Sequence, residues 1–218
     1  MESHIPFIDR FMRIVIEYNF AIEPMQYVAY ALGIIAVLLA AVKAEFARKY
    51  VSLILAIFWI WIGFMFCILY WSQIYPLAHV LGVLFIIQGL LFLIFGFFRQ
   101  DLSFHTEASV YTTLGFIFIV YAMVLYPLIG KYLGRSWPAI LPFGLVPCPT
   151  TPFTFGLLLW ANKKVPFYVF VIPLVAAIFA AGAITFGIYE DIGVFIAGVL
   201  GTILILVRNR TFDANPKS

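Results

Sequence analysis

The sequence predicts an all-α polytopic membrane protein, a helical bundle of about seven transmembrane helices. Of its 218 residues, 65% are hydrophobic and 11% are charged, whereas an ordinary soluble domain has about 45–50% and about 25%. The charged residues also lie between long apolar runs rather than inside them, as expected of helices that cross a bilayer. These two observations exclude a water-soluble monomer, and we expect a single integral-membrane domain over residues 1–218.

Prolines, glycines and charges divide the chain into one amphipathic segment and seven apolar ones. Residues 5–18 predict a helix that lies in the membrane interface, because apolar and charged residues fall on opposite faces. The apolar face has Phe7, Phe11, Ile14 and Val15, and the charged face has Asp9, Arg13 and Glu17. The expected spans are residues 24–42, 51–71, 77–98, 109–130, 139–161, 166–189 and 192–207, with a tail over 208–218.

The lysines and arginines predict the orientation of the bundle. Counted over alternate connections, four lie on the side of the N-terminus and nine on the side of the C-terminal tail, which accounts for all 13. Because Lys and Arg are more frequent in cytoplasmic loops, we expect the N-terminus outside and the C-terminus in the cytoplasm.

The fifth apolar segment cannot be one continuous helix. It contains Pro142, Pro147, Pro149 and Pro152, and each proline removes a backbone donor and disfavours helix at the residue before it. We expect helix to restart with Thr151 as the N-cap, so that only about half of the hydrocarbon core is crossed by helix.

Two interpretations of this broken span are open. In the first, the irregular backbone lines a cavity within the membrane, where a helix start attracts an anion or a carbonyl oxygen. In the second, the prolines shape a re-entrant or extended loop at the outer rim.

Several polar residues are expected on the same, outer side as the broken span. The candidate ligand-binding residues are Asn19, His79, Cys148, Thr150, Thr151, Glu190 and Asp191. Cys148 and His79 are also weak candidates for metal ligands, but no His or Cys pair has ligand spacing on one element. We therefore predict neither a metal site nor a cofactor, and the two cysteines, Cys67 and Cys148, could form at most one disulfide.

Signatures of enzymes and of nucleic-acid binding are missing from the sequence. There is no nucleophile elbow, no paired-histidine zinc helix and no glycine-rich phosphate loop. No cluster of Lys and Arg has the density of a nucleic-acid footprint. The sequence therefore favours a protein without catalytic activity, and an intramembrane enzyme that uses Cys148 or the outer acids is the last-ranked alternative. Nucleic acid is not an expected partner.

Short motifs lie along most of the chain. The most specific is Pro147-Cys148-Pro149-Thr150 followed by Phe153 and Gly156. The others are Pro6-Phe7, Phe11, Tyr18-Asn19, Pro24, Trp59, Trp61, Gly63 and Asp191. Together they resemble the motifs of a bacterial family of multi-pass membrane proteins, domain of unknown function 6064. The resemblance implies a bacterial inner-membrane location and a role for Cys148 to Thr150, but no substrate.

Two functions fit these expectations. The first is binding or transport of a small solute or ion through an outward-facing cavity at the broken fifth span. The second is a non-catalytic structural or assembly subunit of a membrane complex. The expected partners are accordingly the lipid bilayer, a small solute or ion, and a second copy of the chain or another membrane protein.

Overall fold

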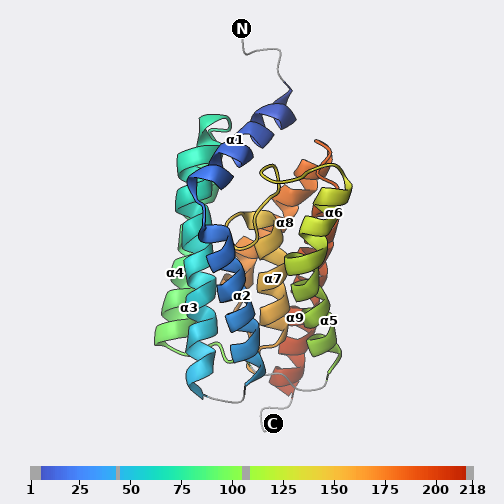
Figure 1. Ribbon diagram of the computed structural model, residues 1–218. Coiled ribbons are helices and arrows are strands. Elements are labelled where there is room, and N and C mark those ends of the chain that lie inside the picture. The colour runs from blue at the N-terminus through green and yellow to red at the C-terminus, as the bar shows by residue number, and fades with distance from the viewer. Residues whose placement is uncertain (1–5, 43–44, 105–108, 215–218) are drawn as a thin grey trace.

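Long helices that run along one common axis build the protein, with one short helix laid across an end of the bundle (Figure 1). The computed structural model describes residues 6–42, 45–104 and 109–214. Over these residues the secondary structure is helical, apart from one isolated bridge between Phe104 and Ala161. The predicted all-α class is therefore confirmed.

The helices follow the order of the predicted segments. They are α1 (Phe7–Ala21), α2 (Met25–Ala41), α3 (Glu45–Trp61), α4 (Ala78–Leu91), α5 (Val110–Val120), α6 (Tyr126–Tyr132), α7 (Pro147–Leu159), α8 (Phe167–Ile184) and α9 (Asp191–Ala214). Helix α3 continues through the π-helical segment η1 (Ile62–Tyr70) into the short 3₁₀ turn η2 (Trp71–Gln73). Two further π-helical segments are η3 (Phe92–Phe98), which extends α4, and η4 (Tyr121–Leu125), which joins α5 to α6.

Five continuous helical stretches among the described residues are long and apolar enough to cross a membrane. They are Lys49–Gln73, Ala78–Phe98, Val110–Tyr132, Phe167–Ile184 and Asp191–Phe212, and each coincides with a predicted span. Helices α1 and α2 would add a sixth if counted as one span, although the chain bends by 83° between them. The exact count of seven spans is not confirmed, because α2 and α7 have only 17 and 13 residues.

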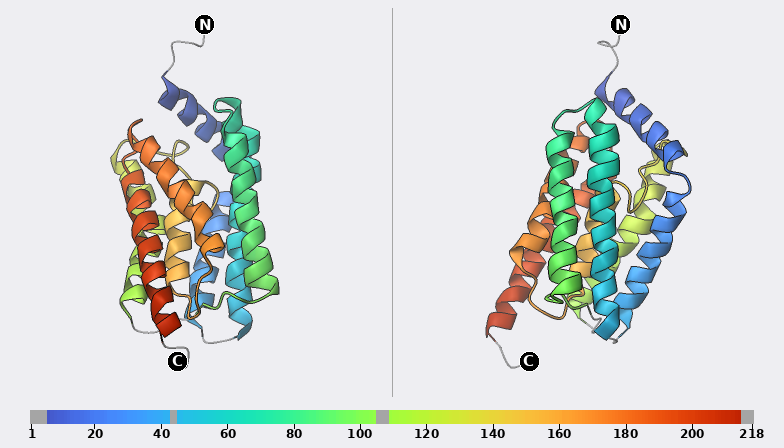
Figure 2. Two further views of the ribbon diagram at one scale, coloured as in Figure 1. Left: turned by 180° about the vertical axis from the view of Figure 1, so that it is seen from behind. Right: turned by 90° about the vertical axis from the view of Figure 1, so that its left-hand side faces the viewer.

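Helix α1 has the amphipathic character that its sequence predicts. Phe11, Ile14 and Val15 are buried, whereas Asp9 and Arg13 are exposed. The helix lies obliquely over one end of the bundle, next to the end of η1 and the loop before α4 (Figures 1 and 2). This end is called the α1 end below, and the opposite end, where α9 finishes, is called the α9 end.

Helix α7 occupies the centre of the bundle. It contacts α3, α5, α8 and α9, and all of its residues except Cys148 are buried. In Figure 1 it begins near the middle of the bundle, below the loop that follows α6, and runs towards the α9 end. Because a 13-residue helix covers about 20 Å, the fifth segment crosses the bundle as a loop followed by a half-length helix.

The start of this half-length helix differs from the prediction. Helix α7 begins at Pro147 with Val146 as the N-cap, so the predicted restart with Thr151 as the N-cap is wrong. Pro147 is favourable at the first helical position, where its missing N–H would have had no partner. Pro152 then lies inside the helix. The helices around α7 bury it and hold its backbone in place.

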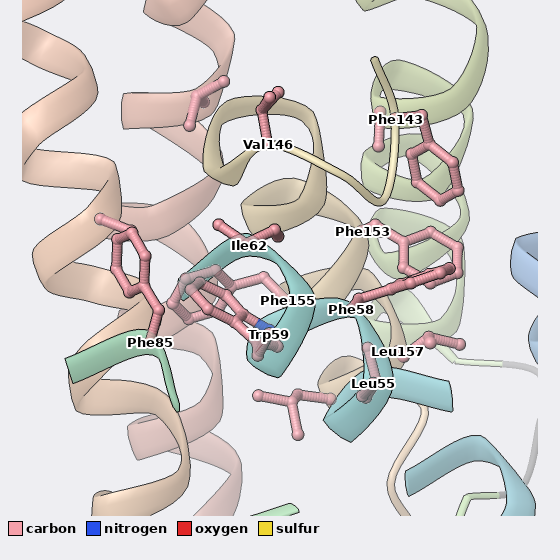
Figure 3. Packing of buried hydrophobic residues seen from close by; sticks show 14 of the residues in the cluster. Leu55, Phe58, Trp59, Ile62, Phe85, Phe143, Val146, Phe153, Phe155 and Leu157 are labelled. Carbon is pink, nitrogen blue, oxygen red and sulfur yellow. The ribbon is translucent and has the colours of Figure 1, made fainter. Parts of the chain in front are cut away.

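The hydrophobic core is formed where α3 and α4 meet the α7 segment. Figure 3 shows Phe58 beside Phe143 and Phe153, and Trp59 near Phe85. The ring centroids of Phe143 and Phe153 are 4.9 Å apart, and those of Trp59 and Phe85 are 5.1 Å apart. Edge-to-face contacts at these distances stabilise aromatic pairs beyond the burial of their surface.

Candidate functional site

The loop before α7 is tied into the bundle by side chains of α1. The Tyr18 hydroxyl donates to the carbonyl of Leu145 at 2.8 Å. The Asn19 amide donates to the carbonyls of Pro138 and Ile140 at 2.6 and 2.7 Å. Loop carbonyls buried away from water need such donors, so α1 determines where the chain enters α7.

In the first turns of α7, threonine hydroxyls donate to backbone carbonyls one turn earlier. The hydroxyl of Thr150 donates to the carbonyl of Val146 at 2.7 Å, and that of Thr151 donates to the carbonyl of Pro147 at 2.9 Å. Both threonines are fully buried. Because each hydroxyl hydrogen is already used, neither threonine offers a free donor to a ligand.

A buried carboxylate lies at the start of α7. Asp191, the first residue of α9, accepts hydrogen bonds at both oxygens, from the Tyr126 hydroxyl at 2.7 Å and from the Cys148 thiol at 3.3 Å. Its side chain has no exposed surface, whereas Cys148 is partly exposed. A carboxyl group that accepts at both oxygens has the pattern of the ionised form, and its place in the first turn of α9 favours a negative charge.

The neighbouring acid, Glu190, has a charge partner of its own. Arg135, in the loop before α7, forms an ion pair with it through two nitrogens, and the Nε to Oε1 distance is 3.0 Å. A third contact joins Arg135 Nη1 to the carbonyl of Gly187 at 3.3 Å, and the Tyr121 hydroxyl donates to the carbonyl of Glu190. All three nitrogens of the Arg135 guanidinium therefore bond to Glu190 or to the loop around it.

A cavity of about 330 Å³ lies next to Cys148 and Asp191. Its wall comes from α1, η1, η2, α4, α8 and the starts of α7 and α9. The aromatic residues in the wall are Phe7, Phe11, Phe66, Trp71, Tyr75, Phe85, Phe179 and Phe186. Apart from the Tyr75 hydroxyl and the Trp71 indole, the side-chain polar groups of this wall are those of Cys148 and Asp191. The site is an aromatic cavity with a polar floor.

The predicted site residues separate into two groups. Cys148 and Asp191 line the cavity together, and Glu190 is adjacent in the chain. Thr150 and Thr151 bond the α7 backbone, while Asn19 holds the loop. These three support the site and do not line its cavity.

His79 lies outside the site. It is exposed at the start of α4, and its Nδ1 is 3.2 Å from the carbonyl of Pro76 in the same turn. The pairing of His79 with Cys148 considered for a metal is therefore not formed. In the described part of the chain no group of three or more His, Cys, Asp or Glu residues could hold a metal ion, and Cys67 and Cys148 are both free thiols.

Three contributors to the site were missed from the sequence. Tyr126 and Arg135 bond the two acids, and α1 supplies aromatic wall residues such as Phe11. The apolar face of α1 was interpreted as facing lipid, although the same amphipathic pattern serves equally well to cover a cavity. No pattern in the sequence distinguishes Tyr126 or Arg135 from other residues at span ends.

No curated protein and no solved structure matches this chain. A family model described as "Family of unknown function (DUF6064)" matches residues 8–216. The match includes the residues of the site described above except Phe7 of the cavity wall, and the resemblance inferred from Pro147-Cys148-Pro149-Thr150 is confirmed. The chain therefore belongs to this family of unknown function.

Proposed function

We propose that this protein binds a small, largely apolar organic molecule in the aromatic cavity at the start of α7. We further propose that it does so as a bacterial inner-membrane protein whose α1 end faces the outside. The observation that carries the proposal is the cavity itself, about 330 Å³ between α1 and the start of the half-length helix.

The size and the wall of the cavity suit an organic ligand. Small-molecule sites have volumes of about 300–1,000 Å³ and apolar walls with few polar groups. The Trp71 indole N–H, which belongs to the wall, is buried and has no hydrogen-bond partner among the described residues. A buried donor without a partner costs about 1–3 kcal/mol, and a ligand with an acceptor atom would remove this cost.

The wall disfavours the hydrated ion or hydrophilic solute that the sequence left open. Removing such a solute from water without replacing its hydrogen bonds is strongly unfavourable. The polar groups of the wall cluster at the floor, where the Cys148 thiol is partly exposed and Asp191 is buried behind it. The proposed ligand therefore has an apolar body and few polar atoms.

A fluorescence titration tests the proposal. The full chain, in nanodiscs of phosphatidylcholine, is titrated with neopentylbenzene while tryptophan emission is recorded, with empty nanodiscs as the blank. We expect a saturable change that is lost in Trp71→Phe, because Trp71 is in the wall.

Two matched variants on α8 distinguish the cavity from the lipid-facing surface. Ala180 is buried and lines the cavity, whereas Ile178 is 53% exposed and does not. We expect Ala180→Phe to weaken binding at least tenfold and Ile178→Phe to leave it unchanged, with Ala183→Phe as a second filling variant. Unsaturable binding, or equal effects of the matched pair, would overturn the proposal and favour the structural or assembly subunit.

A further inference from the structure

We infer that the ligand of the aromatic cavity is an organic cation with an apolar body. The inference rests on the function proposed above and adds the charge of the ligand. It follows from two features that meet at the same cavity, a carboxylate without a charge partner and a wall of aromatic rings.

The first feature is the uncompensated charge of Asp191. Its two hydrogen-bond donors, Tyr126 and Cys148, are both neutral groups. Among the described residues, no Lys, Arg or His forms an ion pair with this carboxylate. A buried carboxylate is ordinarily paired or protonated because its desolvation is costly. The site is thus complete in hydrogen bonds but lacks a positive charge.

The nearest arginine does not supply that charge. Arg135 is held by both oxygens of Glu190 and by the carbonyl of Gly187. The pair of Arg135 and Glu190 is neutral as a unit, so it does not compensate a negative charge on Asp191. On α1, Arg10 is next to the wall residue Phe11 in sequence but does not line the cavity.

The second feature is the arrangement of the aromatic rings. They form a connected set, in which the centroid of Phe7 is 5.1 Å from that of Phe186 and 6.1 Å from that of Tyr75. Trp71 continues the set, at 5.4 Å from Tyr75 and 5.8 Å from Phe66. The faces of aromatic rings attract cations, by about 2 kcal/mol or more where water is excluded.

Both features favour a positively charged ligand. Asp191 has no exposed surface, so a ligand in the cavity would touch the partly exposed Cys148 thiol and not the carboxylate itself. The charge of Asp191 would attract the ligand across this short distance. Charge interactions across a short apolar gap are much stronger than in water. The cavity therefore favours a cation, accepts a neutral molecule of the same shape less well, and disfavours an anion. The proposed preference is the reverse of the anion predicted at the start of the half-length helix, because the carboxylate of Asp191 lies against the Cys148 thiol in the first turn of α7.

Three probes of nearly the same shape test the sign of the ligand's charge. Benzyltrimethylammonium is the cation, neopentylbenzene the neutral isostere and phenylmethanesulfonate the anion. They are titrated as above into nanodiscs of zwitterionic phosphatidylcholine, so that surface charge does not attract the cation. We expect the cation to bind at least tenfold more tightly than the neutral probe and the anion to bind most weakly.

Substitutions of Asp191 test the source of this preference. Asp191→Asn should reduce the preference for the cation over the neutral probe to less than about threefold, whereas Asp191→Glu should retain most of it. If Asp191→Asn does not fold, the order in which the wild-type protein binds the three probes still tests the charge of the ligand. A neutral probe that binds as tightly as the cation, with both blocked by Ala180→Phe, overturns the inference alone. Failure of all three probes to bind overturns the proposed function as well.

Discussion

The hydroxyl of Tyr126 donates to Oδ1 of Asp191 at 2.7 Å and thereby connects α6 to the start of α9. Both residues are buried, with 1% and 0% of their surface exposed. Between them they link three elements, because Asp191 also accepts from Cys148 at the start of α7. This small network is where the proline-interrupted segment is joined to the last helix.

Tyr126→Phe should destabilise the protein by about 1–3 kcal/mol, the cost of a buried acceptor left without its donor. A lower midpoint of thermal unfolding in detergent micelles would measure the effect. Tyr132→Phe is the matched control, because Tyr132 is 92% exposed near the same end of the bundle. Equal midpoints for the two variants would contradict the importance of the bond.

Arg135→Met should destabilise the protein by about 3–5 kcal/mol, because it leaves Glu190 charged and buried without a partner. The side chain of Glu190 is only 2% exposed. The double variant Arg135→Met with Glu190→Met should recover most of the loss, since no unpaired charge remains. A double-mutant cycle of unfolding midpoints measures this coupling, and additive losses would show that the pair is not coupled.

Arg208→Ala should destabilise the α9 end of α7 by about 1.5–3 kcal/mol, the value of hydrogen bonds to a charged group. The buried guanidinium of Arg208 donates to the carbonyls of Leu159 and Leu158 at 2.7 and 3.0 Å. Both carbonyls belong to the last turn of α7, where intrahelical donors run out, and that of Leu158 also accepts from the backbone N–H of Ala161 at 3.2 Å. A positive charge is favourable at a helix C-terminus. Arg210→Ala is the control, because Arg210 is exposed two residues further along α9; an equal effect of both variants would argue against capping.

Gly156→Ala should cost about 1–3 kcal/mol through overpacking. A Cβ atom at Gly156 would stand 2.7 Å from the carbonyl oxygen of Gly115, so α5 and α7 would have to move apart. Gly182→Ala is the control, because a Cβ there meets no atom within 4 Å, and it should be neutral or slightly stabilising. Unfolding midpoints of the two variants distinguish close packing from a general effect of replacing glycine.

Thr151→Val should change the affinity for neopentylbenzene by less than about twofold. The hydroxyl of Thr151 bonds the carbonyl of Pro147 and does not line the cavity. The fluorescence titration described above measures this, with Ala180→Phe as the positive control. A tenfold loss in Thr151→Val would restore Thr151 as a binding residue, as first predicted.

The sequence predicted the long helices well because their limits depend on local chemistry. Charges and prolines cannot lie inside a lipid-exposed helix without cost, so the apolar runs end where the helices end. The start of α7 was misplaced by five residues for the opposite reason. Its four prolines argue against helix locally, yet Pro147 is favourable as the first helical residue, and Pro152 is accommodated inside the helix because neighbouring helices enclose the segment.

The candidate site was predicted in part. Cys148 and Asp191 were placed on the same side of the membrane, and the structure brings them to 3.3 Å. His79 was expected on that side as well but lies exposed at the start of α4. Assigning a residue to one side of the membrane gives its depth but not the direction in which it points around the helix axis. It therefore could not show that Cys148 and Asp191 meet whereas His79 does not join them.

By itself, the sequence determined an all-helical chain with several segments apolar enough to cross a membrane, the approximate limits of these segments, the interruption of the fifth and the amphipathic face of α1. These properties follow from hydropathy, charge and proline chemistry, which act over a few residues. Only the tertiary structure decided that α7 is buried at the centre, that α1 covers an aromatic cavity and that Asp191 is left without a cationic partner. Those properties depend on which faces of distant helices meet, and packing between segments more than 100 residues apart, such as Tyr18 with Leu145, determines them.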